Sequence, residues 1–244
     1  MKLEIKRYNE TKTEAYVEQF IVSHEQTVLN SLIEVKIKHD KSLSFRCGCR
    51  TGVCGSCAVK VNGVEKLACK TVLKENDLIE PLNNSIVIKD LVINLSHEEE
   101  LLKNAKTFLK ESNIKEISPK DEQLIDLQSN CILCQSCFSS CPVYEVNKSF
   151  LGPYTLTRAL RYANDKKELD KKSILQSIQD DGIWDCTLCG NCTMVCPQFI
   201  DPKTDIMNLR MKSVQEGYED KSINTFNNFD LGFDTMGGFN PNGF

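Results

Sequence analysis

Two short runs of the chain, CILCQSCFSSCP at residues 131–142 and CTLCGNCTMVCP at residues 186–197, each hold four cysteines followed by a proline. Both have the spacing C-x2-C-x2-C-x3-C-P. The first three thiols of such a run come from one turning loop and point into one pocket, whereas the fourth, held at a proline-defined turn, points elsewhere. This spacing is typical of proteins that bind two cubane [4Fe–4S] clusters. It predicts a chain that folds around inorganic clusters.

Zinc is the alternative metal for these runs. A four-cysteine zinc site usually draws on two C-x2-C pairs separated by a longer spacer, and four thiols within eleven residues do not fit that arrangement. The chain has thirteen cysteines, an odd number that intramolecular disulfides cannot fully consume. A chain without an export signal is also normally kept reduced. Cluster ligation is therefore favoured over both disulfides and zinc.

A third cysteine group, CGCRTGVCGSC at residues 47–57, precedes both runs. Its spacing, C-x4-C-x2-C with a further cysteine twelve residues on, is that of plant-type [2Fe–2S] ferredoxins, and the ligands it predicts are Cys49, Cys54, Cys57 and Cys69. The glycines in the loop permit a tight path that brings backbone N–H groups near the bridging sulfides. A zinc loop is the alternative here too. Cys47 is left over, and we interpret it as a bystander.

The first hundred residues predict a small α+β domain. Strand-like segments are Leu3 to Tyr8, Glu14 to Val22, 58–70 and 85–95. Residues 27–38 carry a helical apolar stripe behind a cap at Ser23 or Thr27. Asn62-Gly63 supplies the left-handed conformations of a tight hairpin turn within the third segment. We expect residues 85–95 to form one strand that closes the domain.

From about Ser96 the pattern changes to helices, with the cysteine runs between them. The predicted helices are 97–112, 154–165 and 203–217, with Pro153 and Pro202 near the starts of the last two. The predicted domains are a plant-type [2Fe–2S] domain at 1–98, a helical two-cluster domain at 99–218 and a tail at 219–244. The tail holds Phe226, Phe229, Phe233, Phe239 and Phe244. It is interpreted either as a floppy end or as a segment that docks on a partner.

Several classes of protein are not supported by the sequence. A net charge of −4 argues against general nucleic-acid binding. No catalytic residue set, dinucleotide fingerprint or phosphate loop is present, and His24, His39 and His97 lie in polar stretches where we expect them to be solvated. No apolar run has the length of a membrane span, and MKLEIKRYNE lacks the features of a secretory signal, so we expect no anchor or export signal. Three clusters without catalytic residues predict an electron conductor whose substrate chemistry sits on another polypeptide.

The motifs also resemble a known family. SFRCGCRTGVCGSCAVKVNG with KLACKT, CILCQSCFSSCPVY, FLGPYTLTRALRY, and DGIWDCTLCGNCTMVCP with Asp201-Pro202 are similar to the iron–sulfur subunit of succinate dehydrogenases and fumarate reductases. The resemblance covers about residues 1–215. It implies a β-grasp ferredoxin domain followed by an all-α bacterial-type ferredoxin domain. It also implies electron transfer between a FAD-containing flavoprotein subunit, where succinate and fumarate interconvert, and a quinone-reactive partner at the membrane.

The resemblance implies a ligand set for each cluster. The [2Fe–2S] ligands, nearest the flavoprotein, would be Cys49, Cys54, Cys57 and Cys69. The middle [4Fe–4S] ligands would be Cys131, Cys134, Cys137 and the distant Cys196. The third cluster, nearest the quinone, would be held by Cys141, Cys186 and Cys192, with Pro142 close to the quinone. Cys189 stands where a non-cysteine residue usually leaves that cluster as [3Fe–4S], so we expect a second [4Fe–4S] cluster of lowered potential. The alternative is a Cys189 that is turned away from a [3Fe–4S] cluster.

Two further positions depart from members that reduce ubiquinone. Val146 and Thr187 stand where those members have a Trp and a His. This favours a menaquinone-type donor and fumarate reduction. The chain then resembles the methylmenaquinol:fumarate reductases and thiol:fumarate reductases, which have a cysteine-rich partner subunit. We expect a peripheral location at the bacterial cytoplasmic membrane, on the cytoplasmic side, with co-export to the periplasm as the alternative. The remaining alternatives are an iron–sulfur subunit of the glycolate oxidase or heterodisulfide reductase type, and a non-catalytic cluster sensor or zinc-stapled module. The first type usually lacks the plant-type domain.

Overall fold

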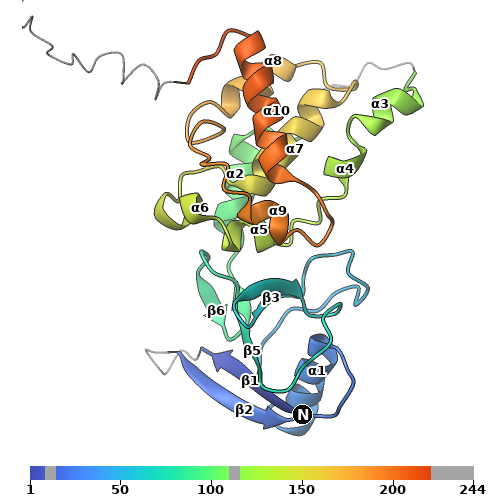
Figure 1. The fold of residues 1–244 in the computed structure, drawn as a ribbon, viewed down its shortest axis with the longest axis vertical. Helices are drawn as coiled ribbons and strands as arrows, with labels where there is room; N and C mark the ends of the chain where they lie inside the picture. Colours follow the sequence, from blue (N-terminus) through green and yellow to red (C-terminus); the bar gives the residue numbers. More distant parts are fainter. Residues whose placement is uncertain (9–14, 110–115, 221–244) are drawn as a thin grey trace, which may run out of the picture.

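The computed structural model describes residues 1–8, 15–109 and 116–220. Most of the predicted tail, including its five phenylalanines, lies outside the described residues. In Figure 1 a sheet with one helix forms the lower part of the molecule, and the upper part is built from helices. The cysteine-bearing segments around α5 and α9 lie where the two parts meet.

The strands in the described residues are β1 (Lys2–Arg7), β2 (Tyr16–Ile21), β3 (Ala58–Val61), β4 (Val64–Leu67), β5 (Asp77–Glu80), β6 (Val87–Lys89) and β7 (Val92–Ile93). The helices are α1 (Val28–Lys38), α2 (Ser96–Asn104), α3 (Pro119–Gln123), α4 (Asp126–Ser129), α5 (Ser136–Ser139), α6 (Pro142–Val146), α7 (Pro153–Asn164), α8 (Lys171–Ser177), α9 (Asn191–Met194) and α10 (Pro202–Gln215).

The N-terminal part is a mixed five-stranded sheet in the order β2-β1-β5-β3-β4. The β1 strand runs parallel to β5 and antiparallel to β2, and β3 is antiparallel to both β4 and β5. Alternation in β1 buries Leu3 and Ile5 completely, and α1 adds Val28 and Leu32 to the same core. This packing of one helix on a mixed sheet is the predicted α+β, β-grasp arrangement.

Local signals within this part are confirmed. Thr27 caps α1 and accepts a hydrogen bond from the backbone N–H of Asn30, which settles the choice between the two predicted caps. Asn62 and Gly63 have φ of 51° and 80°, the left-handed pair that the hairpin between β3 and β4 requires. The β5 strand was not predicted from the sequence, although it lies at the centre of the sheet.

The prediction of one strand over residues 85–95 is wrong, because the chain turns back at Asp90 to form the β6–β7 pair. Asp90 has φ of 47° and is only 1% exposed. Its carboxylate accepts hydrogen bonds from Arg7 Nε at 2.8 Å and from the backbone N–H of Ser44 at 2.8 Å. A buried, fully bonded aspartate therefore sets the turn inside what looks like a continuous apolar run.

Two of the three predicted helices, those near Pro153 and Pro202, are confirmed. Pro153 and Pro202 are the first residues of α7 and α10. The predicted helix at 97–112 is too long, since α2 ends at Asn104 and the chain adopts a left-handed conformation at Lys106, with φ of 50°. Its last residues, 110–112, lie outside the described part of the chain.

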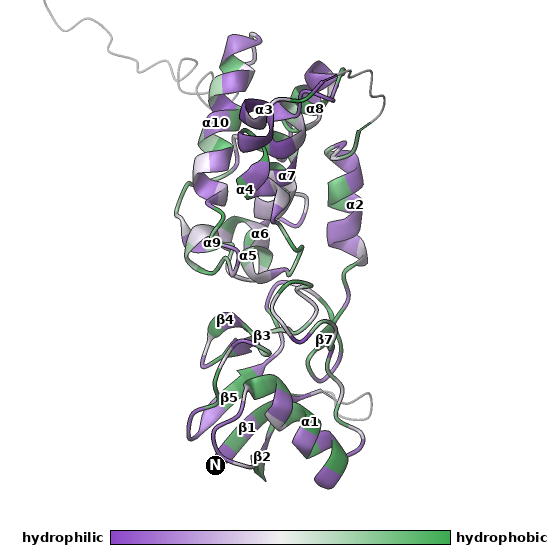
Figure 2. Cartoon of the chain, turned by 90° about the vertical axis from the view of Figure 1, so that its right-hand side faces the viewer, coloured by the Kyte–Doolittle hydropathy of each residue, from purple (hydrophilic) through white to green (hydrophobic). Residues whose placement is uncertain are grey.

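The helical part has its own core around Phe138, which is fully buried. The Phe138 ring packs against Tyr154 and Tyr144 with centroid separations of 4.5 and 4.7 Å. The short helices α3 and α4 are largely hydrophilic, as Figure 2 shows, and lie on the surface of this part. The domain limits at 98 and 218 stay a prediction.

The two parts are joined by direct hydrogen bonds. Asn84, from the N-terminal part, donates to the carbonyl oxygens of Phe138 and Ser139 at the end of α5. The hydroxyl of Ser139 donates to the buried carboxylate of Glu65 on β4 at 2.7 Å. No helix among the described residues has the length and apolar character of a membrane span.

Candidate iron–sulfur sites

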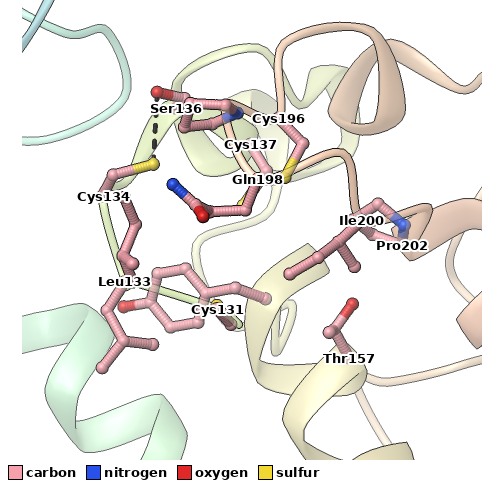
Figure 3. Close-up of a pocket in the computed structure, with 13 residues that line it drawn as sticks. Cys131, Leu133, Cys134, Ser136, Cys137, Thr157, Cys196, Gln198, Ile200 and Pro202 are labelled. Carbon is pink, nitrogen blue, oxygen red and sulfur yellow. Dashed lines mark hydrogen bonds between the residues drawn. The ribbon is translucent and has the colours of Figure 1, made fainter. Parts of the chain in front are cut away.

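One cysteine site is a cavity between α5, α7 and the loop that precedes α10 (Figure 3). Its wall contains four sulfurs drawn from both runs, those of Cys131, Cys134, Cys137 and Cys196. The rest of the lining is mostly apolar and includes Ile200. The structure thus brings the predicted middle set together, with the fourth cysteine supplied from the second run.

Burial controls the protonation of these thiols. It raises the pKa of Cys131 to about 11 and holds that of Cys137, among neighbouring thiols, well above its usual range. Thiols kept protonated by an apolar cavity become ligands when a cationic centre replaces their protons. In the described part of the chain no three His, Cys, Asp or Glu side chains are close enough to hold a single metal ion. The four sulfurs line a cavity, and this donor set fits a cubane cluster.

The third site begins at Cys141, which caps the N-terminus of α6 and accepts a hydrogen bond from the backbone N–H of Tyr144 at 3.5 Å. Burial raises the pKa of Cys141, and the thiols of Cys186 and Cys189 raise it further. Burial likewise raises the pKa of Cys192 to about 12, again with contributions from the same neighbours. The last cysteine of the first run is therefore grouped with the first three of the second run.

The two runs repeat the same backbone conformation. Leu133 and Gln135 have left-handed φ of 52° and 69° on either side of Cys134. The matching positions, Leu188 and Gly190, have φ of 56° and 85° on either side of Cys189. Each run then enters a four-residue helix, α5 or α9. Cys189 therefore occupies the position in the second run that Cys134 occupies in the first, although its side chain is exposed.

The loop with the first cysteine group carries backbone donors directed at sulfur. The N–H groups of Thr51 and Val53 each donate to Cys49 Sγ at 3.4 Å, and that of Cys49 donates to Cys54 Sγ at 3.3 Å. The Thr51 hydroxyl and these N–H groups lower the pKa of Cys49 to about 6. Burial, in contrast, raises the pKa of Cys57 to about 12. The loop offers the stabilisation of negative sulfur that a [2Fe–2S] site needs.

Glycine is required at position 48 of this loop. A Cβ atom on Gly48 would lie 2.8 Å from Cys54 Sγ. The fourth predicted cysteine, Cys69, follows β4 and is buried with Cys57, close enough for the two thiols to interact. All four predicted residues of the first site are therefore on one loop and the strand end beneath it.

The remaining predicted positions lie at the surface. Cys47 is exposed, Pro142 begins α6 and is exposed, and Thr187 and Val146 are exposed, Val146 to 85%. His24 and His39 are exposed as expected. His97 is also exposed, but its ring stacks on Tyr144 and its Nε2 lies 2.7 Å from the carbonyl oxygen of Lys148.

Sequence reasoning missed a buried carboxylate beside the middle site. Asp205 is 3% exposed and accepts hydrogen bonds from Gln128 Nε2 and Thr157 Oγ1, both at 2.8 Å. Thr157 also lines the middle cavity, and burial raises the pKa of Asp205 to about 6. The signal was present, because Asp205 directly precedes Ile206 on the buried side of α10.

The fold and these sites define a two-domain ferredoxin-type electron-transfer protein. Residues 2–100 match the model of a 2Fe-2S iron-sulfur cluster binding domain, and residues 128–200 match that of a 4Fe-4S dicluster domain. The chain is 33% identical to the fumarate reductase iron-sulfur subunit of Haemophilus influenzae over 88% of this chain and 94% of that protein. It is 35% identical to the 8-methylmenaquinol:fumarate reductase iron-sulfur subunit of Wolinella succinogenes, over 79% of this chain and 65% of that one.

A chain of the Mycobacterium smegmatis Sdh1 complex in the apo form has the same fold, with a TM-score of 0.77 over 89% of this chain and 97% of that chain, at 23% identity. Together with the relatives above, these matches cover both domains. The chain belongs to the family of iron–sulfur subunits of fumarate reductases and succinate dehydrogenases. Its cofactors are [2Fe–2S] and [4Fe–4S] clusters, and it is a component of an oxidoreductase complex.

Proposed function

We propose that this chain conducts electrons between a FAD-containing flavoprotein subunit at its first site and a quinone-reactive partner at its third site. Reversible one-electron transfer is the chemistry that the clusters supply when bound. The proposed ligands are Cys49, Cys54, Cys57 and Cys69 for [2Fe–2S], then Cys131, Cys134, Cys137 and Cys196 for the middle [4Fe–4S]. For the third they are Cys141, Cys186, Cys189 and Cys192.

The succession of the sites is the observation that carries this proposal. A Cβ atom on Gly55, next to Cys54, would lie 2.9 Å from Cys134 Cβ, so the first and middle sites touch. Cys192 of the third site contributes to the raised pKa of Cys137 in the middle site. Three adjoining sulfur sites are suited to conduction.

The third site favours fumarate reduction with a low-potential quinol. Cys189 repeats the conformation of Cys134, and a fourth thiolate adds negative charge that lowers the reduction potential of a cluster. The exposed Val146 and Thr187, close to Pro142 and Cys186, offer neither an indole nor an imidazole to a ubiquinone. The Wolinella relative is named for a methylmenaquinol donor, which is consistent with this direction. The proposed location is the cytoplasmic face of a bacterial membrane, to which the quinone-reactive partner attaches the chain.

Iron analysis and low-temperature EPR test the cluster content. We expect about ten irons per chain, from one two-iron and two four-iron clusters. We expect no three-iron signal in the oxidised protein. A chain with zinc in place of iron contradicts the proposal as a whole, and a three-iron signal contradicts the assignment of Cys189. Assays of the purified complex test the direction, which is wrong if succinate oxidation with a ubiquinone analogue outpaces fumarate reduction with a menaquinol analogue.

A further inference from the structure

The loop of the first site is held by the two segments that carry ligands of the middle site. On one side, Gly55 packs so closely that a Cβ atom there would lie 2.7 Å from the carbonyl oxygen of Ile132 and 2.9 Å from Cys134 Cβ. On the other side, Gln198 Nε2 donates a hydrogen bond to the carbonyl oxygen of Gly52 at 3.0 Å. Gln198 follows Cys196 by two residues, and its side chain lies in the middle site (Figure 3). We name these two contacts together the loop clasp.

The clasp is supported by apolar packing. Ile132 and Cys134 belong in sequence to the helical part, but their side chains pack against the core of the N-terminal part. The loop between Gly52 and Gly55 therefore lies between two segments of the middle site, one on each side. Gly52 and Gly55 themselves have left-handed φ of 87° and 72°. Glycine adopts this conformation readily, and it gives the loop the path on which both contacts of the clasp form.

We propose that the clasp sets the separation between the first two clusters, with Gln198 as a positioning residue that ligates neither of them. The rate of electron tunnelling falls off exponentially with the distance between redox centres. A small displacement of the loop that carries the first site therefore changes the rate of electron transfer between the first two clusters. A direct connection between the two sites runs from Cys54 to its neighbour Gly55, whose backbone packs so closely on Cys134 that a Cβ atom on Gly55 would lie 2.9 Å from Cys134 Cβ. The inference rests on the proposed conduction between these sites and names the residues that tune it.

Contacts elsewhere keep the two parts together when Gln198 is changed. The hydrogen bonds of Asn84 to the end of α5 and of Ser139 to Glu65 do not involve the clasp. Substitution of Gln198 therefore frees the loop of the first site locally without separating the two parts. Substitution of Gln198 alone therefore tests whether its side chain positions the loop of the first site.

Four variants of the cluster-loaded chain test the proposal. Gln198→Ala removes the hydrogen bond, and Gln198→Glu keeps the size but cannot donate to the Gly52 carbonyl oxygen. Gln198→Lys restores a donor of sufficient reach. Gln215→Ala, on the exposed end of α10, is the control. Iron content, the EPR signal of each cluster and its midpoint potential are measured first in every variant.

The decisive measurement is the magnetic interaction between the two reduced clusters, which depends on their separation. We expect the enhanced spin relaxation of the [2Fe–2S] centre to weaken in the Ala and Glu variants and to recover in the Lys variant. Intercluster electron transfer in the assembled complex should slow by about tenfold or more in the first two, as misplacements of about 1 Å do for other reacting groups. Gln215→Ala should match the wild type.

Equal relaxation in all iron-replete variants overturns the proposal. Hydrogen exchange of the amides of Thr51 and Val53 provides a second readout, and it should quicken in the iron-replete Ala and Glu variants. Unchanged exchange there also counts against the clasp. Failure of the underlying function has a different signature, since the wild-type chain itself would then lack the two cluster signals.

Discussion

The ring of Phe138 occupies the space in which any residue other than glycine at position 152 would place its Cβ atom. A Cβ there would lie 2.1 Å from the Phe138 ring, and Gly152 has φ of 81° and ψ of 164°, a region that only glycine adopts readily. Phe138 lies between two residues of the first cysteine run, Cys137 and Cys141, and Gly152 is the N-cap residue directly before α7. The contact fixes the helical core directly beneath the cluster-bearing segment.

Substitution of this glycine should be severe. We expect Gly152→Ala to destabilise the loaded protein by about 1 kcal/mol or more for the backbone conformation, with a further 1–3 kcal/mol or so for overpacking of the Phe138 ring. Gly63→Ala is the matched control, since Gly63 also has a positive φ of 80° but has no neighbour within 4 Å of its Cβ position. Thermal unfolding midpoints of the two variants give the comparison. Equal midpoints would show that the clash with the Phe138 ring adds nothing to the loss of stability.

The role of Cys189 is tested by removing its thiol. If Cys189 completes the third cluster, Cys189→Ser should lower the iron content from about ten to about nine per chain, and the three-iron EPR signal should appear in the oxidised protein. Cys47→Ser is the control, because Cys47 is exposed beside the first site and should leave both readouts unchanged. A Cys189→Ser protein that keeps all its iron and stays silent contradicts the assignment.

The cysteine spacing predicts so much here because ligand geometry is local: each run supplies its first three thiols from one loop, and the left-handed residues at 133, 135, 188 and 190 repeat within it. What the sequence did not predict depends on partners far along the chain. The turn at Asp90 requires the buried guanidinium of Arg7, and the hydrogen bond of Gln198 joins residues separated by 146 positions. Neither Asp90 nor Gln198 has a neighbour in sequence that signals its partner.

Asp205 should make stability depend on pH. Burial raises its pKa in the folded protein from 3.8 to about 6, so its contribution is fully present below pH 3.8 and is lost as the pH rises to about 6. Above that pH the buried carboxylate is charged, at a cost of up to about 3 kcal/mol. The unfolding midpoint of Asp205→Asn relative to wild type should therefore rise between about pH 4 and pH 6 and level off above about pH 7. A difference that does not change with pH would show that Asp205 does not titrate in this range.

Phe199 has a left-handed backbone conformation, which costs energy in any residue other than glycine. It has φ of 58°, and its side chain is 89% exposed. We expect Phe199→Gly to raise the unfolding midpoint, corresponding to about 1 kcal/mol of relieved strain. Met194→Gly is the control of opposite sign, because Met194 is 85% exposed but helical, and glycine there should cost about 1 kcal/mol. A lower midpoint for Phe199→Gly would indicate that the ring is held by contacts within the chain.

Removal of the clusters should unfold the helical part. Cys137, Cys141 and Cys192 are buried members of the core that also contains Phe138 and Leu156, so the proposed metal ligands and the apolar core are the same structure. Without iron, their thiols leave an apolar cavity that ligation would otherwise fill, and binding free energy at such sites is folding free energy. After chelation of iron from the whole chain we expect a large loss of helical circular dichroism and of cooperative melting. Both should return when iron and sulfide are restored under reducing conditions. Cooperative melting that survives chelation would show that the apolar side chains alone hold α7 and α10 together.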